Sequence, residues 1–360
     1  MIIHGIIKLS SNHNLHSKEE TLFPINLNLK QEPMNGYLKK RTKLLPIAAR
    51  SYESEQDLID MQSLLMDARS QTDDWRYAHI GELIFNFFMI ASHLDPHKHI
   101  RLWYDAGELV GYAILGEDPS LDWQVLPAYE WCGIEDEAIA WGENLVSELC
   151  RENEKAWGGA IVSGARQDNQ KRFAFLEQHG FHPGGEFSEV NMLRTLNERI
   201  PDSVIPAGYE IRSMSDEDIP RRAEIQHDVW QPWTVGNVSE KDYAYFMQLP
   251  SYQRDLDIIA IAPDGVIASY VNCWIDPVNK IGDFGPVGAR PDHRRKGLTR
   301  AVLLEGLRRM QAYGMNRVCV STGISNIPAK NLYESIGFII VNQYIEFLKK
   351  NDEGKDHKND

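Results

Sequence analysis

The sequence predicts a mixed α/β protein built from two similar domains in tandem, and three observations lead to this fold class. The chain has 360 residues, and 42% of them are hydrophobic, which is enough for two ordinary domain cores. Strand-like and helix-like patterns alternate along the chain. Several of these patterns recur in the second half, as expected of a duplicated unit.

The two ends of the chain lack such patterns. Residues 1–43 are polar and aperiodic after a short apolar start, and residues 349–360 are almost wholly charged or polar. Segments of this composition cannot bury enough apolar surface to offset the entropy of ordering. We therefore expect a flexible N-terminal extension and a flexible tail.

The internal repeat sets the predicted domain borders. Pro127 to Ile134 aligns with Pro291 to Leu298, and hairpin patterns precede both segments. The first domain is expected at residues 44–195 and the second at residues 208–348. Residues 196–207 contain two prolines in a polar stretch and are the predicted linker.

In the second copy, a basic turn lies between a strand pattern and a helix pattern. Leucines at three- and four-residue spacing predict a helix after Gly297, and Gly314 ends it. The start of a helix leaves backbone N–H groups without partners and carries a partial positive charge, so the turn is suited to bind phosphate groups. The alternative interpretation is a solvated charged loop.

Charge and cysteine content restrict the possible partners and compartment. The net charge of −14 argues against a nucleic-acid partner, which normally requires a broad basic surface. A small phosphorylated cofactor fits the local basic turn better. The four cysteines show no metal or redox spacing, and no apolar run reaches the roughly 20 residues of a membrane span. We expect a soluble cytoplasmic protein without a metal site or a membrane partner.

Two motifs in the second copy resemble those of a known family. The segment from Arg294 to Thr299 resembles the acyl-CoA signature of the GNAT superfamily of N-acetyltransferases, and Asn326 to Phe338 resembles the last signature helix of that family. Thr299 departs from the family pattern, which has glycine or alanine there. The tandem two-domain layout is similar to that of mycothiol synthase.

The resemblance implies a fold and a cofactor. Each domain should have a mostly antiparallel twisted sheet with one splayed parallel strand pair and flanking helices. The second domain should use acetyl-CoA as co-substrate. The implied contacts with this cofactor come from the end of a strand, the basic turn and the last helix: Val287, Gly288, Ala289, Arg294, Arg295, Lys296, Gly297, Leu298, Thr299, Arg300 and Asn326.

Acetyl transfer to an amine requires two proton transfers. The amine must lose a proton before it attacks the thioester, and the leaving thiolate benefits from receiving one. The resemblance implies Asp283 as the base, with a water relay or an ordinary strand residue as the alternatives. It implies Tyr333 as the acid, and the alternative for Tyr333 is a core residue.

The first copy lacks the residues that this chemistry needs. Glu130 aligns with Arg294, and Leu176 aligns with Tyr333. A carboxylate at the pyrophosphate position repels the cofactor. We therefore expect a degenerate first domain that is not catalytic.

These expectations combine into an N-acetyltransferase that moves an acetyl group by direct attack from acetyl-CoA to the amine of an unidentified small molecule or peptide. The alternative from another class is a non-enzymatic acyl-CoA sensor or scaffold. An aminoglycoside-modifying enzyme would use the same cofactor site and should have an acidic acceptor cleft. The sequence does not indicate an oligomeric state.

Overall fold

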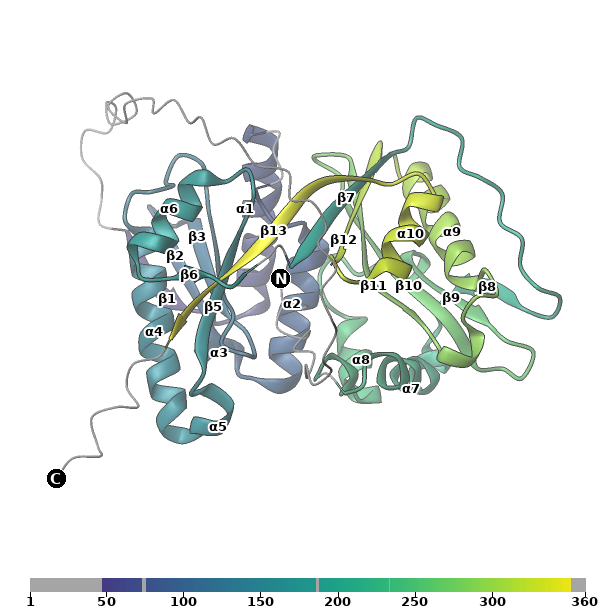
Figure 1. Ribbon diagram of the computed structural model, residues 1–360, viewed down its shortest axis with the longest axis horizontal. Helices are drawn as coiled ribbons and strands as arrows, with labels where there is room; N and C mark the ends of the chain where they lie inside the picture. Colours follow the sequence, from purple (N-terminus) through teal and green to yellow (C-terminus); the bar gives the residue numbers. More distant parts are fainter. Residues whose placement is uncertain (1–46, 73–75, 186–187, 233, 351–360) are drawn as a thin grey trace, which may run out of the picture.

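In the computed structural model, two halves lie side by side, each with strands covered by helices (Figure 1). The structure describes residues 47–72, 76–185, 188–232 and 234–350. The predicted N-terminal extension and residues 351–360 of the predicted tail lie outside these ranges. Strand pairing is mostly antiparallel, with a parallel pair in the second half, so the predicted fold class is confirmed.

The first half contains an antiparallel sheet of four strands in the order β1-β2-β3-β4. Its elements are β1 (Ala48–Ser51), α1 (Glu55–Thr72), α2 (Ile80–His93), α3 (Pro96–His99), β2 (Ile100–Asp105), β3 (Glu108–Leu115), β4 (Leu121–Val125), α4 (Ile134–Glu152), α5 (Glu154–Trp157), β5 (Ala160–Arg166), α6 (Gln170–Gln178), β6 (His182–Pro183) and β7 (Glu189–Thr195). The predicted hairpin joins β2 to β3. Ala106 and Gly107 at its turn both have positive φ, 51° and 91°, as a two-residue hairpin turn of this hand requires.

The second half supplies most of a sheet of nine strands. Its elements are β8 (Glu210–Ser213), α7 (Ile219–Trp230), α8 (Glu240–Phe246), β9 (Asp257–Ile261), β10 (Ile267–Asp276), β11 (Ile281–Ala289), α9 (Leu298–Ala312), β12 (Arg317–Gly323), α10 (Ile327–Ser335) and β13 (Ile339–Lys350). The strand order is β5-β13-β7-β12-β11-β10-β9-β8, and β6 pairs with β13.

The last strand of each half crosses into the other half. β7 pairs with β12 along its whole length, from Thr195 opposite Arg317 to Glu189 opposite Gly323. β13 begins beside β7 and continues beside β5, and Figure 1 shows it as a long yellow strand that runs from one half to the other. The predicted border between the domains therefore separates strands that share one sheet. β13 also includes Lys349 and Lys350, the first residues of the predicted tail.

Matched turns in the two halves confirm the internal repeat. α4 and α9 each begin after a glycine in the left-handed conformation, Gly133 with φ 106° and Gly297 with φ 79°. The Asn169 side chain caps α6, and the Asn326 side chain caps α10, in each case by accepting the backbone N–H three residues further on. These turns recur because both halves repeat the same order of strand, turn and helix.

Helix α2 joins the two halves. Its apolar side chains lie in one hydrophobic cluster with Tyr243, Phe246 and Trp274 of the second half. A Cβ atom on Gly81 would lie 2.3 Å from the Trp274 side chain, so only glycine allows this close approach. The start of α2 is thereby held against the sheet of the second half.

Strands β11 and β12 pair only at their beginnings. Ile281, Gly282 and Asp283 lie opposite Arg317, Val318 and Cys319 in parallel register, and α9 connects the two strands. This arrangement confirms the predicted strand, turn, helix and strand unit. After Asp283, the two strands separate, because β12 continues beside β7 while β11 stays with β10.

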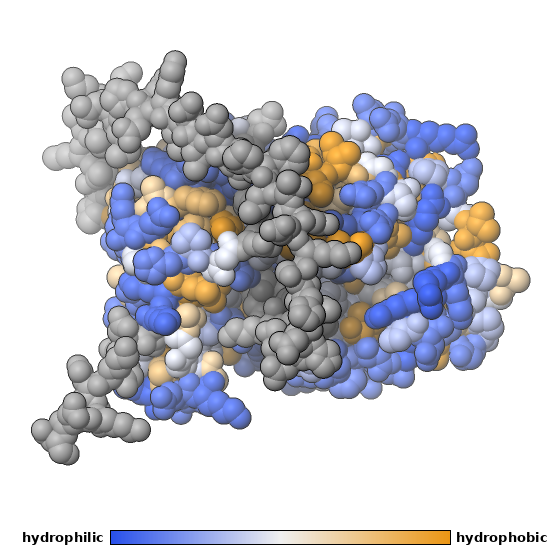
Figure 2. All heavy atoms as spheres, in the orientation of Figure 1, coloured by the Kyte–Doolittle hydropathy of each residue, from blue (hydrophilic) through white to orange (hydrophobic). Residues whose placement is uncertain are grey.

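Hydrophilic residues cover most of the visible surface of the described residues, and hydrophobic side chains form small separate groups (Figure 2). The hydrophobic residues are instead concentrated in three buried clusters. Within the described ranges, every helix is too short or too polar to cross a membrane.

Candidate active site

The basic turn lies at the start of α9, as predicted. Arg294, Arg295, Lys296 and Gly297 are all exposed there, before a helix of 15 residues. Exposed cationic side chains at a helix N-terminus suit an anionic ligand. The turn therefore has the chemistry that a pyrophosphate requires.

The conformation of Gly297 explains why glycine stands in this turn. Its φ of 79° lies in the left-handed region, which costs other residues about 1–2 kcal/mol. A Cβ atom added there would meet only the carbonyl oxygen of Val204, at 3.7 Å. The turn thus requires glycine for its backbone conformation more than for space.

The three residues that follow Gly297 differ in exposure. Leu298 is buried in the core, while Thr299 and Arg300 are half-buried. The Ser269 hydroxyl donates to the carbonyl of Gly288 at 2.8 Å, and the Thr299 hydroxyl lies 3.1 Å from the Ser269 oxygen, which can accept its hydrogen. These hydrogen bonds tie the start of α9 to β10 and β11, which gives Thr299 a structural role.

The remaining predicted cofactor residues border the gap between β11 and β12. Val287, Gly288 and Ala289 form the end of β11, beyond the part that pairs with β12. Gly288 has no room for a side chain, because a Cβ atom would lie 2.4 Å from the Tyr270 ring. Asn326 caps α10 across the gap. A role of these residues in binding acetyl-CoA stays a prediction.

Asp283 lies where β11 and β12 separate, and its side chain is 13% exposed. Burial raises the pKa of its carboxyl to about 7, while hydrogen bonding to the Cys319 thiol opposes this rise. Sγ of Cys319 lies 3.2 Å from Oδ1 of Asp283. A carboxyl with this pKa exchanges its proton near neutral pH, as a general base must.

His79 approaches Asp283 from the first half, yet the two do not form an ion pair. The amide of Gly81 donates to Nδ1 of His79 at 3.0 Å, so Nδ1 carries no hydrogen, and Nε2 donates to the carbonyl of Ile281 at 3.3 Å. Burial lowers the pKa of His79 to about 3. The ring is therefore neutral, and its Nδ1 lies 4.0 Å from Oδ2 of Asp283 without supplying a charge.

Tyr333 lies in the core of the second half, 5% exposed, against Phe338. Burial and the charge of Asp283 raise the pKa of its hydroxyl well above the ordinary value. The hydroxyl therefore stays protonated at every physiological pH. Tyr333 does not line the pocket described next, so its role as the acid stays a prediction.

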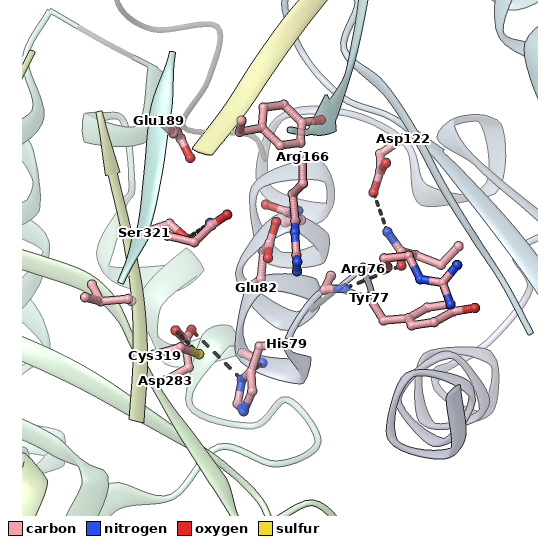
Figure 3. A pocket seen from close by; sticks show the side chains of 18 of the residues that line it. Arg76, Tyr77, His79, Glu82, Asp122, Arg166, Glu189, Asp283, Cys319 and Ser321 are labelled. Carbon is pink, nitrogen blue, oxygen red and sulfur yellow. Dashed lines mark hydrogen bonds and ion pairs between the residues drawn. The ribbon is translucent and has the colours of Figure 1, made fainter. Parts of the chain in front are cut away.

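A pocket with an empty volume of about 1220 Å³, its open mouth included, lies between the two halves. In Figure 3, Asp283, Cys319 and Ser321 lie on the side of the second half, and Arg76, Tyr77 and Asp122 lie on the opposite side. Further polar side chains of the lining come from α2, β5, α6 and β7: Glu82, Asn86, Arg166, Arg172, Glu189 and Asn191. Asp283 lines this pocket, and the other predicted site residues, which the structure also describes, do not.

Sequence reasoning missed the wall that the first half contributes. Most of its residues lie outside the repeated motifs, with Asn169 as an exception, and nothing in the sequence links His79 or Glu82 to Asp283. The internal repeat could have pointed to Gly164 to Arg166, because β5 matches β12 in chain order. Among the described residues, no group of three or more His, Cys, Asp or Glu side chains could hold a metal ion.

In the first half, a basic side chain of α6 contacts β4 beside the pocket. Arg172 of α6 donates to Oδ1 of Asp122 at 2.7 Å and to the carbonyl of Trp123 at 3.2 Å, and its guanidinium lies 4.0 Å above the Trp123 ring. Glu130, which aligns with Arg294, accepts the hydroxyl hydrogen of Tyr77. Arg172 is thus held against β4, and Glu130 is held by Tyr77.

Comparison with known proteins points to one family. Residues 222–338 match the family model of the acetyltransferase (GNAT) family. The mycothiol acetyltransferase of Arthrobacter sp. (strain FB24) is 24% identical over 247 residues, which cover 65% of this chain and 72% of that protein. The mycothiol acetyltransferase of Streptomyces coelicolor is 25% identical over 264 residues, 67% of this chain and 76% of that protein.

Solved structures share the fold. A GCN5-related N-acetyltransferase from Sphaerobacter thermophilus superposes with a TM-score of 0.57 at 20% identity, covering 86% of this chain and 97% of that chain. A tandem GNAT protein from the clavulanic acid biosynthesis pathway superposes with a TM-score of 0.58 at 13% identity, covering 85% and 98%. At these identities, the likeness concerns the fold.

Proposed function

We propose that this chain, whose residues 222–338 match the acetyltransferase (GNAT) family, transfers an acetyl group from acetyl-CoA to an amine. In this proposal the second half carries out the transfer, and the amine is held in the pocket between the halves. The observation that carries this proposal is the position of Asp283. It lies where β11 and β12 separate, and it also lines the pocket. The acetyl group and the amine could therefore meet beside one carboxyl group.

The cofactor would lie along the gap between β11 and β12. Its pyrophosphate would accept hydrogen bonds from the turn at Arg294 to Gly297, and the end of β11 would face its pantetheine arm. This placement is supported by the exposed basic turn before α9 and by the absence of β12 pairing along Val287 to Ala289. Acetyl-CoA itself supplies the activated thioester.

Asp283 would remove the proton from the amine. An alkylammonium of the lysine type has a pKa of about 10, so most of the acceptor arrives protonated at neutral pH. A carboxylate whose pKa is about 7 is a stronger base than an ordinary aspartate. It can accept the ammonium proton as the nitrogen attacks the thioester carbonyl.

Tyr333 would donate a hydrogen bond to the sulfur as it leaves. A thiol of ordinary acidity has a pKa of about 8.5, and the pKa of Tyr333 is raised well above its own ordinary value. Complete proton transfer from Tyr333 to the thiolate is therefore uphill. Stabilisation of the developing charge by the O–H group is the role that we assign to it.

Replacement of Tyr333 by phenylalanine is expected to lower kcat by roughly 10²-fold, the lower end of the range for removing one hydrogen-bond donor that stabilises developing negative charge. The substitution removes only the hydroxyl, so the contact with Phe338 should persist. Acetyl-CoA affinity and the melting temperature should change little. An unchanged kcat, in conditions where chemistry limits turnover, would show that Tyr333 is a core residue.

The first half would shape the acceptor site and leave the cofactor to the second half. This assignment is supported by Glu130, which places a carboxylate before α4 where the second half has the cation of Arg294 before α9. We expect native mass spectrometry to find one acetyl-CoA per chain. Two bound cofactors per chain would contradict this assignment.

The pocket lining includes carboxylate, guanidinium, amide and hydroxyl groups, which supports a small polar amine as the acceptor. The decisive experiment is CoA release measured over a panel of amino acids, polyamines, aminoglycosides, amino sugars and peptides. Turnover with one class identifies the acceptor. Tight acetyl-CoA binding without turnover on any of them would favour the sensor.

A further inference from the structure

We propose that Cys319 is a positioning residue for Asp283, and that its thiol holds the carboxyl group in both of its protonation states. This inference rests on the proposed role of Asp283 as the base. The two residues lie directly opposite one another in the parallel pair of β11 and β12. Both line the pocket between the halves, at the point where the strands separate.

The thiol has two acceptors within reach and one hydrogen to donate. Sγ of Cys319 lies 3.2 Å from Oδ1 of Asp283 and 3.3 Å from the carbonyl oxygen of Gly282. When Asp283 is a carboxylate, the hydrogen is better donated to Asp283, because a charged acceptor makes the stronger bond.

After Asp283 accepts a proton from the amine, the same contact can reverse. The carboxyl O–H then becomes a donor, and the thiol sulfur is a weak acceptor within reach. The S–H hydrogen turns to the carbonyl of Gly282. Asp283 therefore keeps a partner before and after proton transfer, and the backbone does not need to move.

Cys319 is suited to this role and not to attack on the thioester. Burial and the nearby charge of Asp283 raise the pKa of its thiol well above the ordinary value. Nucleophilic cysteines require the opposite shift. The sulfur thus stays protonated at neutral pH and keeps the hydrogen that the contact with Asp283 uses.

The other ionisable groups around Asp283 are less able to switch between donating a hydrogen bond to its carboxylate and accepting one from its protonated carboxyl. The ionisable side chains that face it from α1, α2, β10 and α10 are Arg69, His79, Glu82, Cys273 and Tyr333. Arg69 donates to the carbonyls of Tyr77 and Ala78, and the ring of His79 is fixed in one tautomer.

The pH dependence of kcat/KM tests the proposal with two opposite substitutions. The wild-type value of kcat/KM should fall below about pH 7, and we call this fall the limb near pH 7. In Cys319→Ala, the Asp283 carboxylate loses a hydrogen-bond donor, so the pH of this limb should rise by roughly 0.5–1 unit. In Cys319→Ser, a stronger donor faces the carboxylate, so the limb should move down by a similar amount. Cys273→Ala, which removes a buried thiol from β10, should leave the limb in place.

A second measurement does not depend on turnover. The S–H stretching band of Cys319, identified by its loss in Cys319→Ala, should shift in infrared spectra as Asp283 titrates near pH 7. In Asp283→Asn, the same band should be independent of pH over this range. If Cys319 were purely structural, its S–H band would not shift with pH in the wild-type protein, and Asp283→Asn would not change this.

The two proposals fail in different ways. If Asp283→Asn leaves kcat/KM unchanged, the base assignment is wrong, whatever the thiol does. If Asp283→Asn removes the limb near pH 7 but both Cys319 variants keep it in place and the S–H band does not titrate, the base assignment holds and Cys319 does not position it.

Discussion

Asp283→Asn is expected to lower kcat/KM for acetyl transfer by roughly 10²–10⁴-fold, the range that a positioned general base contributes. The wild-type rate should fall as pH drops through about 7, because the carboxyl whose pKa burial raises then becomes protonated. The variant should lack this dependence and retain only the limb set by the amine itself. Kinetics between pH 5 and 10 with an identified acceptor would measure both effects.

Glu189→Gln is the matched control for Asp283→Asn. Glu189 lies in the same pocket, and burial raises the pKa of its carboxyl to about 7 as well. It comes from β7, opposite Gly323, away from the point where β11 and β12 separate. Loss of the Glu189 carboxylate should at most change KM for the acceptor. The fall in activity near pH 7 should stay in place. If Glu189→Gln removes that limb and Asp283→Asn does not, Glu189 is the base.

Local signals in the sequence predicted the elements of the proposed cofactor site. Gly297 and Asn326 mark the starts of α9 and α10, because each satisfies a requirement of a helix N-terminus that depends on a few neighbouring residues. The repeat of these turns in the first half made the duplication visible. The roles of these residues toward acetyl-CoA remain predictions.

The pairing of β7 and β13 with strands of the other half could not be predicted in the same way. Each strand has a pattern that suits a sheet, but the pattern does not identify the neighbour, because many strands offer the same ladder of hydrogen bonds. The linker between β7 and β8 is long enough to let β7 lie in the second sheet. The partner of each strand depends on packing between distant parts of the chain.

The pocket could not be predicted from the sequence for the same reason, because it too depends on contacts between distant parts of the chain. Spacing from the basic turn pointed to Asp283, but its raised pKa depends on burial by elements from the first half, among them the start of α2. His79 and Cys319 carry no sequence signal, because their positions become meaningful only when α2, β11 and β12 meet. The chemistry of this carboxyl is therefore a property of the assembled pair of halves.

Gly297→Glu should weaken acetyl-CoA binding by at least roughly 100-fold. A carboxylate would lie beside the turn that we assign to the pyrophosphate, and like charges about 4 Å apart repel by about 4 kcal/mol near a protein surface. Some stability will also be lost, because the φ of 79° at this position is unfavourable for a side chain. Calorimetric titration with acetyl-CoA and thermal unfolding would separate the two effects.

Two controls isolate the charge from the backbone. Gly297→Ala introduces the same backbone strain without a charge, so it should lower stability and weaken binding far less. Gly133→Glu places the same side chain on the matching glycine of the first half, which also begins a helix in the left-handed conformation and has open space around it. If Gly133→Glu weakens binding as much as Gly297→Glu does, or if neither changes it, acetyl-CoA does not bind at the start of α9.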